Sequence, residues 1–119
     1  MAAPNIKSPT TITGKTARTT LATTSITSVL TNSAGSGKVL KINTIFAANI
    51  SGSSATISIS VYNGTSDTYI AYTISVPQNA TQIISSKETY FYLEEGDSIR
   101  ATSGTASAMS VIVGYEEFA

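Results

Sequence analysis

The feature that most constrains the fold is a series of short stretches in which apolar and polar side chains alternate, running from Lys38 to the end of the chain. Alternation with a period of two residues is typical of β-strands that bury one face. The spacers between the stretches are rich in Ser, Thr, Gly and Asn, which favour turns. Strong helix formers such as Leu, Glu, Lys and Gln are scarce. The chain is therefore predicted to be all-β.

About eight strands follow from this pattern, at the short and regular spacing of a sandwich or jelly roll. Within residues 38–50, Leu40, Ile42, Phe46, Ala48 and Ile50 share one parity and are predicted to lie on one face. The predicted fold is a single antiparallel β-sandwich, jelly-roll-like, with an extended N-terminal arm. The predicted strands are 25–31, 38–50, 56–62, 70–76, 81–85, 89–93, 98–102 and 109–115.

Residues 1 to about 36 differ from the rest because their apolar side chains lie among many Thr and Ser, and the first predicted strand within them begins at residue 25. Pro4 and Pro9 keep the beginning of the chain extended. A disordered tail is one alternative, but the high content of β-branched residues favours an arm that becomes a strand against the domain or a neighbour. We therefore divide the chain into an extended arm, residues 1–24, and a β-sandwich domain, residues 25–119.

The few charged residues, 12% of the chain, are distributed unevenly along it. Five basic residues precede the first acid, Asp67, whereas the rest of the chain has two basic and seven acidic residues, which gives +5 before Asp67 and −5 from Asp67 onward. Such asymmetry can steer a molecule onto another copy or an oppositely charged partner, although chance placement is an alternative. The net charge of zero argues against a nucleic-acid partner. No stretch is apolar enough to span a membrane.

The chain has few side chains suited to catalysis or metal binding. It contains no histidine, the usual general base, and no cysteine for thiolate metal sites. The acidic turn at residues 94–97 lacks the alternating spacing of a calcium loop. We expect no catalytic, cofactor-binding or metal-binding residues, no cofactor and no enzymatic activity. Six tyrosines leave a carbohydrate-binding surface open as an alternative: Tyr62, Tyr69, Tyr72, Tyr90, Tyr92 and Tyr115.

Two predicted strands, at residues 90–93 and 109–115, carry apolar groups on both faces. A sandwich sheet normally has one polar face. We therefore expect these apolar groups to be covered by the arm, by loops of the same chain or by another subunit. Protein interfaces are depleted in charge at their cores, which agrees with the low charge of this chain. The candidate interface residues are Lys7, Lys15, Arg18, Tyr90, Tyr92 and Ile112.

Two segments near the end of the chain carry a family resemblance. The sequence 92–99 contains L-x-x-G-D-x-I, and residues 111–117 read V-x-V-x-Y-E-E. In this pattern, residues 38–117 resemble small accessory virion proteins of tailed bacteriophages. The resemblance implies a jelly-roll-like fold, a structural role and homo-oligomers, often trimers, that clamp neighbouring capsid subunits.

The predicted function is thus that of a virion structural protein, a capsid decoration or cement protein on the capsid surface. Its partners would be itself and the major capsid protein or other virion proteins. A tail, neck or fibre-associated virion protein of the same fold is one alternative. A glycan-binding β-sandwich module is an alternative of another class.

Overall fold

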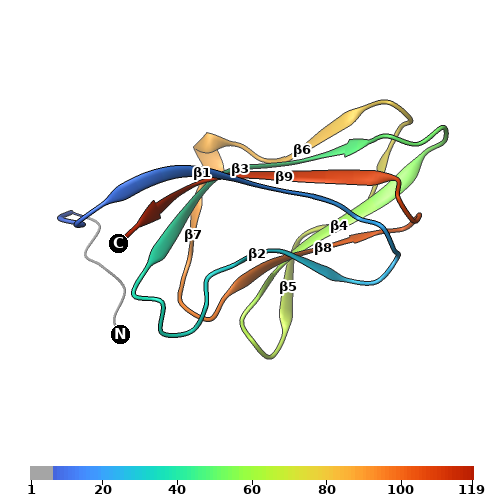
Figure 1. Ribbon diagram of the computed structural model, residues 1–119. Helices are drawn as coiled ribbons and strands as arrows, with labels where there is room; N and C mark the ends of the chain where they lie inside the picture. Colours follow the sequence, from blue (N-terminus) through green and yellow to red (C-terminus); the bar gives the residue numbers. More distant parts are fainter. Residues whose placement is uncertain (1–6) are drawn as a thin grey trace.

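The computed structural model describes residues 7–119, which form nine β-strands and one short 3-10 helix (Figure 1). Eight strands were predicted, and the ninth lies in the N-terminal arm, at residues 12–20. The elements are β1 (Ile12–Thr20), β2 (Thr27–Thr31), β3 (Val39–Asn49), β4 (Ala55–Tyr62), β5 (Asp67–Val76), β6 (Thr81–Ser85), η1 (Lys87–Thr89), β7 (Phe91–Leu93), β8 (Ser98–Ser103) and β9 (Met109–Phe118).

The strands form two antiparallel sheets. In the first, sheet A, the order is β1-β9-β3-β6, and β7 also pairs with β3. In the second, sheet B, the order is β2-β8-β4-β5. Because β6 and β7 pair with successive parts of β3, they occupy one strand position, and each sheet has four positions. The chain crosses repeatedly between the sheets, as in a jelly roll. The predicted all-β, antiparallel sandwich is confirmed.

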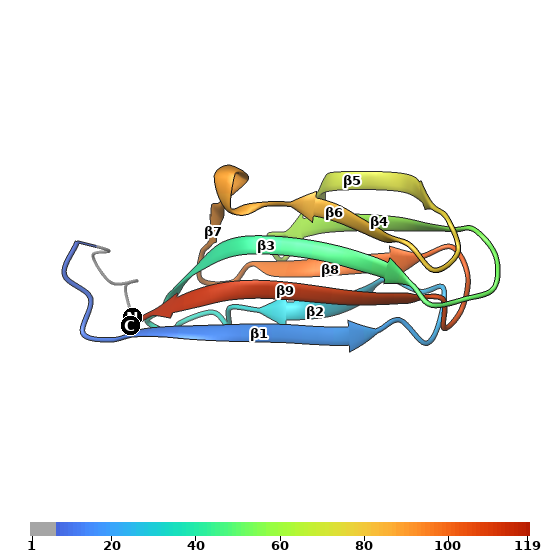
Figure 2. The ribbon, with the colours of Figure 1, turned by 90° about the horizontal axis from the view of Figure 1, so that it is seen from above.

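Strand β1 forms one edge of sheet A, along the lower border of the molecule in Figure 2. It pairs with β9 over its full length without a register shift. Just before β1, Thr11 and Ala119 exchange two backbone hydrogen bonds of 3.0 Å. Just after it, the Leu21 N–H donates to the Met109 carbonyl at 2.8 Å, and the Leu21 side chain is buried in the core. The division into arm and domain at residue 24 stays a prediction.

Strand β3 changes its buried face at a β-bulge. Opposite β9, Ile42 pairs with Tyr115 and Thr44 with Gly114, so Asn43 is an extra residue. The predicted single parity over residues 38–50 is therefore wrong beyond Ile42. The extra residue turns Phe46 and Ala48 outward and leaves Ile50 exposed, whereas Ile45, Ala47 and Asn49 are buried.

The core lies between the sheets and draws on nearly every strand. Its buried side chains are mainly Ile, Val, Leu and Ala, and the alternation that predicted the strands places them there. The largest fully buried apolar side chains are Leu21, Ile42, Ile45, Ile57, Ile59, Val76, Leu93, Ile99, Met109, Val111 and Val113.

A buried asparagine, Asn49, joins three backbone segments at one end of the sandwich. Its side-chain Nδ2 donates to the carbonyls of Val76 and Ser53, both at 2.9 Å. Its Oδ1 accepts from the backbone N–H and the hydroxyl of Ser51, at 2.9 and 2.7 Å. All the polar groups of this side chain are thus used, as a buried amide requires.

Replacing Asn49 with alanine is expected to destabilise the sandwich by roughly 1–3 kcal/mol, because the buried carbonyl of Val76 loses the side-chain donor that Asn49 supplies. Urea denaturation of Asn49→Ala measures this change. Gln82→Ala is the control, since within residues 7–119 the Gln82 amide bonds only to the carbonyl of the next residue, Ile83. Equal free energies of unfolding for both variants would contradict the assigned role.

Candidate assembly surface

The solvent side of sheet A carries a row of apolar side chains that crosses three strands. Ile112 of β9 lies opposite Phe46 of β3, and Phe46 lies opposite Ile83 of β6. Directly opposite residues share a face of the sheet. Ile112 and Phe46 are half-buried, and Ile83 is 64% exposed. We call these three residues the apolar row. Its position on the solvent face makes it a candidate contact surface.

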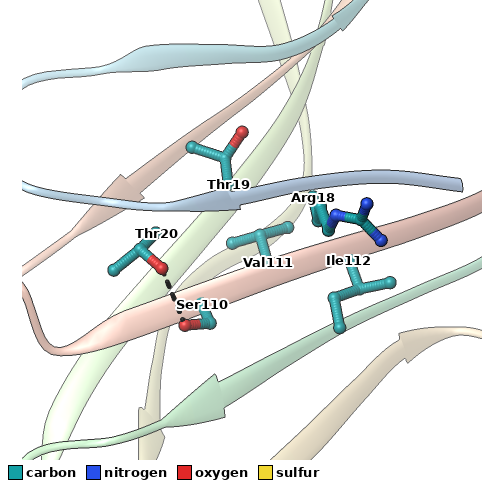
Figure 3. Close-up of a pocket in the computed structure, with 6 residues that line it drawn as sticks. All are labelled: Arg18, Thr19, Thr20, Ser110, Val111 and Ile112. Carbon is teal, nitrogen blue, oxygen red and sulfur yellow. Dashed lines mark hydrogen bonds between the residues drawn. The ribbon is translucent and has the colours of Figure 1, made fainter.

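Small side chains flank the apolar row on both sides. On one side, Ser110 of β9 lies between Thr20 and Ala48, and the hydroxyls of Thr20 and Ser110 are 3.1 Å apart (Figure 3). On the other side, Gly114 lies opposite Thr44. Because these neighbours are small, they leave the row accessible from the solvent side, most of all at Ile83.

Arg18 continues the row onto the edge strand. It lies opposite Ile112 in the β1–β9 pairing, and the two side chains lie next to each other in Figure 3. Arg18 forms no salt bridge within residues 7–119. The end of the β1–β9 pair holds a shallow pocket of about 290 Å³, lined by Arg18, Thr19, Thr20, Ser110, Val111 and Ile112.

Most of the other basic residues of the first part of the chain pair with the two glutamates of β9. The carboxylate of Glu117 lies 2.9 Å from the Lys15 ammonium and 3.0 Å from that of Lys38. Lys41 lies 4.0 Å from Glu116, which also accepts a 3.0 Å hydrogen bond from the Asn43 amide. Much of the charge asymmetry of the sequence is therefore balanced within the chain.

The environment of Glu117 lowers the pKa of its carboxyl. The largest cause is the hydrogen bond from Lys15, and the bond from Lys38 acts in the same direction, while burial opposes both. The same contact raises the pKa of Lys15. A carboxyl with a lowered pKa in the folded state stabilises the fold above its ordinary pKa, and this contribution disappears as the pH falls through the lowered value.

Glu117→Gln is accordingly expected to reduce the free energy of unfolding at pH 7, and the difference from wild type should shrink as the pH falls below the ordinary glutamate value of 4.5. Denaturant unfolding at neutral and acidic pH measures this dependence. Glu88→Gln, at an exposed residue of η1, is the control with little effect at either pH. A loss for Glu117→Gln that is equal at both pH values would argue against the ion pairs as its cause.

The two predicted interface tyrosines, Tyr90 and Tyr92, lie near the other border of sheet A. Tyr92 of β7 lies opposite Lys41, and the Tyr90 and Tyr92 rings meet edge to face with centroids 5.9 Å apart. The Lys41 ammonium lies 4.4 Å from the centre of the Tyr90 ring, within range of a cation–π interaction. Lys41 lies opposite both Tyr92 and Glu116, so the three residues share one face of the sheet. Ile112 lies on the same face as Glu116 because the two are four residues apart along β9, and Tyr92 therefore shares the outer face with Ile112.

Three other tyrosines lie on sheet B, around an ion pair. The Arg100 guanidinium forms two hydrogen bonds with Asp67, of 3.0 and 2.6 Å, and stacks 3.9 Å above the Tyr62 ring. The hydrogen bond from Arg100 lowers the pKa of Asp67. The exposed rings of Tyr69 and Tyr72 meet edge to face at 4.9 Å. The tyrosines thus belong to separate surfaces.

The structure places Arg18 beside Ile112 and Tyr90 beside Tyr92, all around the outer face of sheet A. Lys15 is held by Glu117, and Lys7 is exposed ahead of β1. Their roles at an interface stay predictions. Sequence reasoning did not identify two members of the apolar row, Phe46 and Ile83, because only the pairing of strands reveals their common face.

Within residues 7–119, no group of three or more His, Cys, Asp or Glu residues could hold a metal ion. No helix in this part of the chain is long and apolar enough to cross a membrane.

No family model matches the chain, and no curated protein matches it. Among solved structures, its fold is similar to that of Bacillus endospore appendages, a family of disulfide-linked pili, with a TM-score of 0.54, 13% identity, and 91% of this chain and 88% of that chain covered. Two crystal structures of a pentameric capsid protein from metagenomic phage sequences have TM-scores of only 0.39 and 0.38, at 17% and 18% identity. The matches cover 88% of this chain in both cases, and 59% and 64% of those chains. The likeness to the appendage protein is one of fold.

Proposed function

We propose that the chain is a virion structural protein of the capsid decoration or cement type, which binds neighbouring capsid subunits through the outer face of sheet A. The observation that supports this most directly is the apolar row of Ile112, Phe46 and Ile83 on a solvent-facing sheet. Burying one such side chain at an interface is worth about 1.5–3 kcal/mol. Many copies on one particle would add their weak contacts through multivalency.

The fold also suits this role. A jelly roll offers a sheet as a contact face, and the fold is similar to that of an appendage protein from a family of disulfide-linked pili. That family is described as disulfide-linked, whereas the present chain has no cysteine. Assembly here would therefore depend on non-covalent contacts. The proposal assigns no catalytic step and no cofactor to the chain.

Ile83→Glu tests the proposed contact face. The variant is expected to bind particles of the source virus that lack the protein roughly tenfold to hundredfold more weakly, because a charge replaces an apolar side chain that the proposed contact would bury. Co-sedimentation with the particles measures binding. Ile50→Glu is a matched control, since Ile50 is similarly exposed, at 57%, but lies outside the apolar row.

Undiminished binding of Ile83→Glu would contradict the assignment of this face. Absence of the chain from purified virions, by mass spectrometry, would contradict the virion role itself. Labelling with antibodies against the chain separates a position on the capsid from one on the tail, neck or fibres, the alternative within the same class.

The tyrosine cluster of sheet B favours a second candidate function, the binding of glycans. Exposed aromatic rings can stack on sugars, and the Arg100–Asp67 pair beside them offers fixed polar groups.

A glycan array tests this second function. Binding by the wild-type chain should be lost in the double variant Tyr69→Ala/Tyr72→Ala and kept in the control Tyr90→Ala, whose ring packs against Tyr92 of the other sheet. An array without signal from the wild-type chain would rule the function out for the glycans displayed.

A further inference from the structure

The edges of the two sheets differ in how well they could accept another strand. Within the described residues 7–119, β2 and β6 have five residues each and their pairing is shifted, and β7 has only three residues. Strand β5 is longer, but its pairing shifts twice and Thr73 has a positive φ of 46°. Such irregularities are known to block edge-to-edge pairing. Strand β1, by contrast, is nine residues long and regular.

Along the edge of β1 that faces away from β9, a regular series of backbone groups forms no hydrogen bond within residues 7–119. Thr11 exchanges both of its hydrogen bonds with Ala119, and Leu21 donates to Met109. Hydrogen-bonded and non-bonded positions alternate in an antiparallel pair. The odd-numbered residues of β1 therefore bond to β9, and the N–H and C=O groups of the even-numbered residues point away from it. These residues are Ile12, Gly14, Thr16, Arg18 and Thr20.

We propose that two copies of the chain pair antiparallel through β1, with Thr16 at the two-fold axis, so that the two A sheets form one continuous sheet. This inference rests on the proposed assembly role and identifies the edge through which the protein associates with itself. In this register the five outward-pointing residues of one copy face those of the other, which allows roughly ten backbone hydrogen bonds. The apolar rows of both copies remain exposed on the same side.

The charges of β1 select this register. With Thr16 at the axis, Arg18 faces Gly14 of the second copy and Lys15 faces Ala17. An axis at Lys15 would place the two Lys15 side chains opposite each other, and like charges in that position are destabilising. A two-fold axis at Ala17 would leave Ile12 of each copy without a partner in β1 of the other copy, so there would be fewer hydrogen-bonded pairs.

Gly14 and Glu116 complete the charge complementarity. Glu116 is the β9 partner of Gly14 and lies on the same face as Arg18. A Cβ atom on Gly14 would meet nothing within 4 Å, so the fold of one chain leaves open space there. Arg18 of the second copy would extend over this space toward the Glu116 carboxylate, two strand spacings or about 10 Å away between Cα atoms. Arg18, which has no salt bridge within residues 7–119, thereby gains an acidic partner.

Cysteine scanning tests the register, since the chain has no native cysteine. In Thr16→Cys the two Cα atoms would lie about 5.5 Å apart, within the range of a disulfide. Mild oxidation should therefore crosslink Thr16→Cys dimers several-fold more than Lys15→Cys or Ala17→Cys, which report the neighbouring registers. Equal crosslinking of the three variants, or none, would overturn the pairing.

Charge reversal tests the Arg18–Glu116 contact in the full chain. Arg18→Glu should weaken the dimer measured by light scattering, and Arg18→Glu/Glu116→Arg should restore it, while unfolding curves confirm that each variant is folded. A dimer or trimer in which the Thr16→Cys variant does not crosslink would overturn this inference and leave the proposed function standing. A chain that is monomeric and also fails to bind particles would contradict both.

Discussion

The β-bulge at Asn43 is the constraint on which both the core and the candidate surface depend. Because β3 contains one residue more than β9 at this point, its buried positions change from Leu40 and Ile42 to Ile45 and Ala47. The same change turns the large Phe46 side chain to the solvent side of sheet A. Gly114 permits the close approach at the bulge, since a Cβ atom there would lie 2.9 Å from the Thr44 methyl group.

Alternation in the sequence was enough to predict the sandwich and most of its strands, because burial of one face is the same physical requirement in every strand. It did not show β1. The face of β1 toward the core contains Thr13, Lys15, Ala17 and Thr19, and only Ala17 among them packs on the core cluster as an apolar side chain. The strand forms through backbone pairing with β9, and in the sequence only the β-branched residues of the arm indicated that it could become a strand.

The candidate surface was accessible from the sequence only in part. Arg18 and Ile112 were selected by unrelated signals, a basic arm and a strand apolar on both faces, and the structure makes them direct neighbours. Phe46 was predicted to share a face with Leu40 and Ile42, because a single asparagine in the sequence gives no sign of a bulge. The uneven charge suggested attraction to a partner, but Lys38 is paired with Glu117 in the same chain. The sequence shows how many charged residues the chain has, but it does not show which of them form ion pairs.

The physical character of β1 suggests why it would accept another strand. Hydrogen bonds next to both of its ends, from Thr11 to Ala119 and from Leu21 to Met109, hold it beside β9. Its own burial is small, so it contributes little hydrophobic stabilisation, and elements of this kind open at low free-energy cost. A partner strand would satisfy the outward-pointing groups of Thr16 and its neighbours in both copies at once. Pairing at this edge would therefore stabilise the least buried strand of sheet A and keep the apolar row free for a different contact.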